Sequence, residues 1–215
     1  MFNPTVAYRQ TPAIKQRLEE TRARIVTSAT ELIHDHGYAG CSMAAVAERA
    51  EIATGTIYRF FPSKGELFAE VFRTACAKEV AAASASAQKT LEAGQPTEAL
   101  IAAVRTFSKR ALKAQKLAYA LIAEPVDPLV EAERLSFRSA YTDIFATGIA
   151  QCIELGLLPK QNPQVSGAAI VGAISDVLIV PLGKGHADPD VVPEIESFVR
   201  RALGVSIKEQ TDAHS

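Results

Sequence analysis

Hydrophobic positions near the start of the chain recur every three or four residues, the spacing that places side chains on one face of an α-helix. The positions that define this first face are Leu18, Ile25, Ala29, Leu32 and Ile33. Gly37 follows the last of them, and glycine readily adopts the left-handed conformation that closes a helix. The pattern therefore predicts a first helix that ends near Gly37.

Two short helices separated by a tight turn are expected next. Ser42 can cap a helix over residues 43–50, residues 51–53 make the turn, and a third helix covers residues 54–60. Seven residues at about 1.5 Å each give a rod of about 10 Å, which fits a DNA major groove about 12 Å wide. The third helix is therefore a candidate for reading DNA.

A fourth helix is predicted to begin at Lys64 and to run to about Thr90. Pro62 breaks the preceding helix, and Ser63 with Glu66 has the sequence of a capping box. The exposed N–H groups and positive dipole of this helix start favour a phosphate, and Lys64 adds a full charge there.

The rest of the chain keeps a helical pattern without clean strand alternation. Thr97 is expected to cap a fifth helix that ends at Lys113, and Asp127 followed by Pro128 signals the start of a seventh. The other predicted helices cover residues 116–124, about 164–180, and a last segment from Asp188-Pro189 to Leu203. The sequence thus predicts about nine helices in all.

The predicted helix over residues 164–180 is apolar on nearly every side and must be covered on nearly every side. A small bundle covers only its inner face, so a second copy is expected to cover the other in a symmetric homodimer. A membrane span is the alternative, and the carboxylate of Asp176 together with Pro181 favours a buried soluble helix. The predicted interface residues are Val171, Val177, Leu178, Val192, Ile195, Phe198 and Val199.

Composition and charge are those of a folded intracellular protein. The 215 residues are 48% hydrophobic, which supplies a substantial core. Residues 1–67 hold eight Lys or Arg and seven Asp or Glu, a balance of +1, and the remainder holds fifteen and seventeen, a balance of −2. Three cysteines leave one unpaired under any bridging scheme, which suits a reducing cytoplasm. A redox-sensing cysteine is the less favoured alternative.

Residues 24–67 contain an ordered series of short motifs, namely Gly37-Tyr38, Ser42-Met43, Val46-Ala47, Ala50, Ile52, Gly55-Thr56-Ile57-Tyr58, Phe60-Phe61, Ser63-Lys64 and Glu66-Leu67. With these residues the segment resembles the DNA-binding domain of the TetR family of bacterial transcriptional repressors. That family usually has glycine where this chain has Glu51 and serine where it has Ala53. We expect Glu51 to tolerate the turn at a conformational cost and Ala53 to forfeit a cap hydroxyl.

The resemblance implies an all-α fold with an N-terminal three-helix helix-turn-helix DNA-binding domain and a C-terminal helical bundle. The DNA-binding domain would cover residues 1–62, of which 1–11 are a flexible tail. The effector-binding and dimerisation domain would cover residues 63–206, and residues 207–215 would form a second flexible tail. The homodimer would form through the last two long helices.

The DNA-contacting side chains are expected on and beside the third helix. Thr54, Gly55, Thr56 and Arg59 are predicted near base edges or adjacent phosphates, since threonine methyls can touch thymine and arginine can bond to guanine. Tyr58 is predicted on the DNA backbone, because its hydroxyl can reach a phosphate. Two further predicted backbone contacts come from the neighbouring helix starts, namely Ser42 and Lys64.

Proteins of this kind bind a small effector in the C-terminal bundle, and the resemblance implies that this moves the fourth helix and releases the DNA. Aromatic side chains are the candidate cavity walls, although plain core packing is the alternative for each of them. For Asp176, too, a structural role is the alternative. The predicted pocket residues are Phe72, Phe107, Tyr119, Arg138, Tyr141, Phe145 and Asp176, with Glu124 as a further polar candidate, more typical of a satisfied helix end.

No catalytic set, metal site or cofactor is predicted. His34 and His36 lie about 200° apart around a helix axis and cannot share a metal from one face. His186, Asp188 and Asp190 could hold a cation weakly, but a solvated turn is favoured. The sequence has no glycine-rich phosphate loop, Walker lysine or serine elbow.

The predicted function is therefore that of a ligand-responsive DNA-binding transcriptional regulator, with no enzymatic activity. Its partners would be double-stranded operator DNA, a second copy of itself and a small-molecule effector, with no membrane. By the family default it is a repressor that binds a palindromic operator and leaves it when the effector binds. The alternative is a small-molecule-binding or interaction protein whose helical head is not used on DNA, a reading that the negative charge of Glu51 supports.

Overall fold

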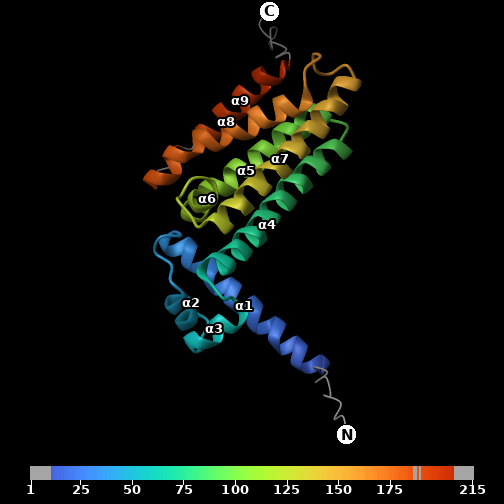
Figure 1. The fold of residues 1–215 in the computed structure, drawn as a ribbon. Helices are drawn as coiled ribbons and strands as arrows, with labels where there is room; N and C mark the ends of the chain where they lie inside the picture. Colours follow the sequence, from blue (N-terminus) through green and yellow to red (C-terminus); the bar gives the residue numbers. More distant parts are fainter. Residues whose placement is uncertain (1–10, 186–187, 189, 206–215) are drawn as a thin grey trace, which may run out of the picture.

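The computed structural model describes residues 11–185, 188 and 190–205, and within them the chain is built from helices alone. A head of three helices joins a body formed by the other six (Figure 1). The helices are α1 (Pro12–His36), α2 (Met43–Arg49), α3 (Thr54–Phe60), α4 (Lys64–Glu92), α5 (Pro96–Lys113), α6 (Gln115–Ile122), α7 (Pro128–Glu154), α8 (Pro163–Lys184) and α9 (Val191–Leu203).

Local capping signals determine most helix starts. The Ser42 hydroxyl accepts the Ala45 N–H at 3.1 Å, the Ser63 hydroxyl accepts the Glu66 N–H at 3.1 Å, and the Asp127 carboxylate accepts the Leu129 N–H at 3.0 Å. The predicted starts of α2, α4 and α7 are therefore confirmed. The predicted tails, residues 1–11 and 207–215, lie outside the described part of the chain except for Thr11, whose hydroxyl accepts the Ile14 N–H as the cap of α1.

Three predicted boundaries are wrong. Helix α5 begins at Pro96 with Gln95 as its cap residue, because a proline fits the first helical turn and displaces Thr97 from that role. Helix α8 continues through Pro181 to Lys184 and ends at Gly185 with φ of +65°. Helix α9 begins at Val191 after Asp190, later than predicted, and Pro189 lies outside the described residues.

The described chain has two hydrophobic cores, one in the head and one in the body, and α4 contributes residues to both. Its first half, including Leu67 and Phe72, packs with α1, α2 and α3, while Ala83 packs in the body with α5, α7, α8 and α9. Phe137 on α7 lies against both cores. A movement of α4 or α7 would therefore change the packing in both the head and the body. The division of the chain into two domains at residue 62 stays a prediction.

The inner face of α1 runs from Ile25 to Ile33, and all its apolar residues there are buried. Leu18, which the sequence pattern placed on the same face, is instead 38% exposed. The reason is that the first half of α1 extends beyond the head, where no other helix covers it (Figure 1).

All three cysteines are buried, and burial raises the pKa of the Cys76 thiol to about 12. A protonated, covered thiol is a poor nucleophile. We expect the three thiols of the native protein to react with Ellman's reagent at pH 8 at least about 100-fold more slowly than after unfolding in urea. Rapid reaction of one native thiol would instead support the redox-sensing alternative.

Candidate functional site

Helix α3 presents an open surface and is held from behind by two buried side chains. Ile57 is fully buried and Phe61, just after the helix, is 2% exposed. On the outward side Tyr58 is 51% exposed, and Thr54 and Arg59 are also exposed. The predicted contact residues on this helix are therefore free to meet a partner, with the half-buried Thr56 beside them.

Gly55 also lies on this outward surface. A Cβ atom added at Gly55 would meet no other heavy atom within 4 Å, so the space in front of it is open. Glycine in a helix is less favourable than alanine by about 0.5–1 kcal/mol, and nothing within the protein demands it here. The absence of a side chain is useful where another molecule approaches the backbone closely.

The turn before α3 contains Glu51 and Ala53, the two residues that differ from the usual TetR-family pattern. Glu51 has φ of +55°, the one positive value at a non-glycine residue in the described chain. This conformation costs an L-residue about 1–2 kcal/mol. Ala53 occupies the cap position of α3 without a side-chain hydrogen bond. Both expectations about the turn are confirmed.

A concave surface lies between the first half of α1 and α3. Arg17 and Arg22 line it from α1, and Thr56 and Arg59 from α3. Arg22 is already held by Glu70 and lies 4.4 Å from the centre of the Phe61 ring. Arg17 and Arg59 form no ion pair with the described residues. Arg17 was not among the predicted contact residues, since only the fold brings it to the same surface as Arg59.

Lys64 does not extend toward solvent as the phosphate assignment requires. Its Nζ lies 4.3 Å from the centre of the Tyr38 ring and 3.4 Å from the Tyr38 carbonyl oxygen. The cation–π contact holds the half-buried side chain against the head. Ser42, by contrast, is exposed, although its hydroxyl already caps α2.

The head and the body are joined where the loop after α6 meets the loop after α1. The Glu124 carboxylate accepts the backbone N–H groups of Tyr38 and Ala39, each at 2.9 Å. A Cβ atom at Gly65, the second residue of α4, would lie 2.6 Å from the Asp127 carboxylate. Glu124 is thus a satisfied structural carboxylate at a close-packed junction.

Arg134 on α7 holds the other side of this junction. Its guanidinium donates to the carbonyl oxygens of Ala120, Leu121 and Glu124 at 2.9, 3.1 and 2.7 Å, and it pairs with Glu131. Arg134 therefore fixes the end of α6 and positions the Glu124 backbone. A displacement of α6 or Arg134 would reach the head through Glu124.

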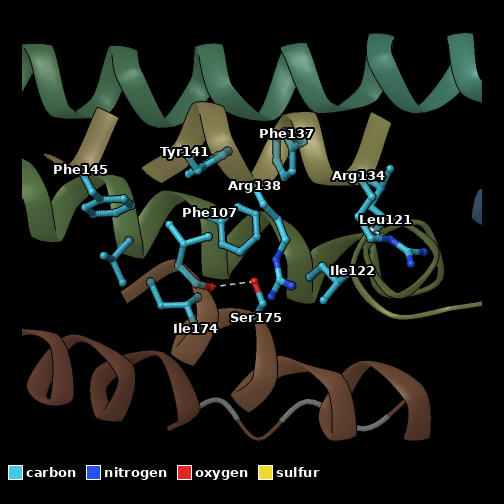
Figure 2. Close-up of a pocket in the computed structure, with 12 residues that line it drawn as sticks. Phe107, Leu121, Ile122, Arg134, Phe137, Arg138, Tyr141, Phe145, Ile174 and Ser175 are labelled. Atoms are coloured by element: carbon cyan, nitrogen blue, oxygen red, sulfur yellow. Dashed lines mark hydrogen bonds between the residues drawn. The ribbon is translucent and has the colours of Figure 1, made fainter. Parts of the chain in front are cut away.

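A mostly apolar cavity lies between α5, α6, α7 and α8, directly beside Arg134 (Figure 2). It occupies about 480 Å³ including its open mouth. Figure 2 shows Arg138 reaching from α7 past Phe107 toward Ser175 on α8. Its lining residues are Val104, Phe107, Leu121, Ile122, Arg134, Phe137, Arg138, Tyr141, Phe145, Val171, Ile174 and Ser175.

The structure brings together four of the seven predicted pocket residues, namely Phe107, Arg138, Tyr141 and Phe145. Phe72 lies instead in the head core against Tyr38, and Tyr119 packs beside Gly183. Asp176 is exposed, because the turn of α8 that places Ser175 inward directs its neighbour outward. These three side chains do not line the cavity.

The predicted dimer residues divide into three groups. Val177 and Phe198 are 48% and 45% exposed and can meet a second copy. Val171 is half-buried and lines the cavity. The remaining four pack within the chain, since they lie on the inner faces of α8 and α9: Leu178, Val192, Ile195 and Val199. Other exposed apolar residues of α8 are Val165 and Val180, and this helix is the one described that is long and apolar enough to span a membrane.

The fold and its exposed third helix define a helix-turn-helix protein with a helical body that holds a cavity. Residues 25–71 match the model of the family described as bacterial regulatory proteins, tetR family. By this segment the head of the chain is similar to that family.

Relatives of known name match the same segment. The chain is 49% identical over 49 residues to the transcriptional repressor KstR of Rhodococcus jostii, and 44% identical over 50 residues to the uncharacterized regulator YhgD of Bacillus subtilis. These matches cover 23% of this chain and 23% and 26% of the relatives. The chain thus spans about a quarter of the length of the curated relatives it matches.

Solved structures match the fold over most of the chain. The regulator FadR from Bacillus subtilis in complex with stearoyl-CoA has a TM-score of 0.72 at 16% identity, covering 86% of this chain and 98% of that one. RolR in complex with resorcinol has a TM-score of 0.69 at 19% identity, covering 94% and 98%. At these identities the likeness establishes the all-α fold alone.

Proposed function

We propose that the protein is a ligand-responsive transcriptional regulator that binds DNA through α3 as a homodimer, and that it acts as a repressor in the cytoplasm. The outward surface of α3, with exposed Tyr58 and Arg59 on a firmly anchored helix, is the observation that carries the proposal. A short rigid helix with exposed polar side chains suits the major groove. Residues 1–62 would form the DNA-binding domain and residues 63–206 the effector and dimerisation domain.

The concave surface between α1 and α3 would receive the DNA backbone. Arg17 and Arg59 supply cations there, and phosphate contacts of this kind give much of the affinity and most of its salt dependence. The inward-facing Lys64 makes its contribution indirect, because it holds the Tyr38 loop against the start of α4.

Exposed apolar residues on α8 and α9 support the homodimer. Val165, Val177, Val180 and Phe198 are all between 45% and 64% exposed. A second copy that covers them would remove this apolar surface from water. A two-fold pair would place the two α3 helices on half-sites of a palindromic operator, about 34 Å apart or somewhat more.

Release by a small molecule would start in the cavity. Leu121 and Ile122 on α6 and Arg134 on α7 line it, and Arg134 bonds to the Glu124 backbone. The Glu124 carboxylate in turn holds the Tyr38 and Ala39 N–H groups of the head. A ligand that displaces α6 therefore changes the position of the head relative to the body.

Operator selection from a random DNA pool tests the proposal. We expect the purified protein to enrich an inverted repeat and Arg59→Ala to relax the preference at one or two positions of each half-site, a loss of about 1–3 kcal/mol of discrimination. Lys109→Ala, on α5, is the matched control and should enrich the same repeat as the wild type. Enrichment of no sequence would favour a ligand-binding protein that does not use its head on DNA.

Gly55→Ala is expected to separate stability from DNA binding. The methyl group meets open space within the protein and favours the helix, so the free energy of unfolding should rise by about 0.5 kcal/mol. At the DNA surface the same methyl group would obstruct close approach, and operator affinity should fall about tenfold. Urea unfolding and fluorescence anisotropy measure the two effects. Unchanged affinity would place Gly55 away from DNA.

A further inference from the structure

The arginines of the described residues differ in whether a carboxylate neutralises them. Those that pair with one are Arg22, Arg49, Arg73, Arg105, Arg110, Arg134 and Arg200. Arg17, Arg24, Arg59, Arg138 and Arg201 form no such pair with any described residue. Three of these five lie in the head, where DNA phosphates would neutralise them. Arg201 is exposed on α9, where it donates to Ser197, and Arg138 lies in the body at the cavity.

Arg138 is one of two cations in the cavity wall, and the two have different roles. Arg134 is buried and already bonded to three backbone carbonyl oxygens and to Glu131. Arg138 makes no side-chain hydrogen bond to the described residues, and its guanidinium lies between α7 and α8 beside Ser175 (Figure 2). A guanidinium next to apolar surface with its donors unused is suited to bind an anionic oxygen pair.

The other residues that line the cavity indicate the chemical nature of the rest of the ligand. Phe107, Phe137, Tyr141 and Phe145 form an aromatic side, with Phe107 and Phe137 packed edge-on against Tyr141 at centroid distances of 5.3 and 4.7 Å. Ile174 adds an aliphatic side chain from α8. Such walls favour a compact apolar or aromatic body over a polar one.

The remaining polar side-chain groups that line the cavity are two hydroxyl groups. Ser175 donates to the Val171 carbonyl oxygen at 2.8 Å, so its oxygen is left to accept a hydrogen bond. The Tyr141 hydroxyl is buried without a partner in the described chain, and burial raises the pKa of Tyr141 above its usual value, which keeps it protonated as a donor. Neither group carries a charge that could balance a second negative charge on the ligand.

We infer that the effector is a small organic monocarboxylic acid, bound with its carboxylate on Arg138 and its apolar or aromatic body among Phe107, Phe137 and Phe145. Arg138 is exposed at the open mouth of the cavity, and its one unpaired guanidinium balances one negative charge, whereas a phosphate dianion would find no second unpaired cation among the lining residues. The inference rests on the proposed function only in naming the ligand an effector. The binding site itself is independent of whether α3 is used on DNA.

Calorimetric titration of the full chain with matched acids and amides tests this inference. The probes are phenylacetate and hexanoate together with their neutral amides, phenylacetamide and hexanamide. We expect at least one acid to bind saturably and at least about tenfold more tightly than its amide, since a charge-assisted hydrogen bond contributes more than a neutral one.

Arg138→Gln is the decisive variant. We expect it to abolish the preference for the acid over the amide while the affinity for the amide changes less than threefold. Arg201→Gln is the matched control, because Arg201 is exposed on α9 and donates to Ser197 away from the cavity. The control should keep the wild-type preference, and circular dichroism shows whether each variant is folded.

Three results would overturn the inference: amides that bind the wild type as tightly as the acids, unchanged acid binding in Arg138→Gln, or no saturable binding of any acid at millimolar concentration. The operator-selection experiment distinguishes failure of this inference from failure of the proposed function. Acid binding that depends on Arg138, without any operator selection, would support the ligand site and contradict the regulator proposal. Operator selection without acid binding would support the DNA-binding proposal and contradict the ligand site.

Discussion

Val177→Glu combined with Phe198→Glu is expected to convert the proposed dimer to a monomer and to weaken operator binding by about 100-fold or more. Both side chains are about half exposed on α8 and α9, and the proposed interface would bury them against a second copy. Two charged groups placed in that interface would lose their hydration without a partner. Each head would then bind its half-site alone, without the gain from a linked second contact.

Analytical ultracentrifugation and fluorescence anisotropy measure the two consequences in the same preparation. Leu135→Glu is the control, because Leu135 is an exposed leucine of α7 outside α8 and α9. It should remain dimeric and bind DNA like the wild type. A double variant that stays dimeric would show that the two copies meet through another surface.

Arg134→Met is expected to lower the free energy of unfolding by about 3 kcal/mol. The substitution leaves the carbonyl oxygens of Ala120, Leu121 and Glu124 without their donor at a buried position. Unsatisfied buried acceptors cost about 1–3 kcal/mol each, although neighbouring losses do not add fully. For a chain of this length the midpoint of thermal unfolding should fall by about 6–12 °C.

Urea and thermal unfolding followed by circular dichroism check this result. Arg105→Met is the control, because Arg105 pairs with Glu196 at a more exposed site and such a pair contributes about 1 kcal/mol or less. Equal losses in the two variants would show that Arg134 does not hold the end of α6. A loss confined to Arg134→Met supports its place at the junction of the head and the body.

Local signals in the sequence were sufficient for much of the fold. Ser42, Ser63 and the Asp127-Pro128 pair determine helix starts through hydrogen bonds within a few residues, and these starts were predicted correctly. The position of α3 was also predicted correctly, because the turn before it and Pro62 after it bound a segment of fixed length. Such features depend little on distant parts of the chain.

The contacts between helices that are distant in sequence could not be predicted from such local signals. Phe72 and Phe145 are both aromatic residues on long helices, and only the packing places one in the head core and the other at the cavity. Lys64 turns inward because Tyr38 lies beside it, across 26 positions of sequence. Asp176 lies in the middle of an apolar run of sequence, yet one helical position separates its exposed side chain from the inward-facing Ser175.

The salt dependence of DNA binding tests the central claim most directly. Fluorescence anisotropy would measure the dissociation constant of the full chain for DNA from upstream of its own gene, between 50 and 300 mM salt. We predict saturable binding to a fragment with an inverted repeat, with a slope of log K against log salt of about −4 or steeper. No binding at about 50 mM salt, or equal affinity for unrelated DNA of the same length, would contradict the assignment of α3 as a DNA-reading helix.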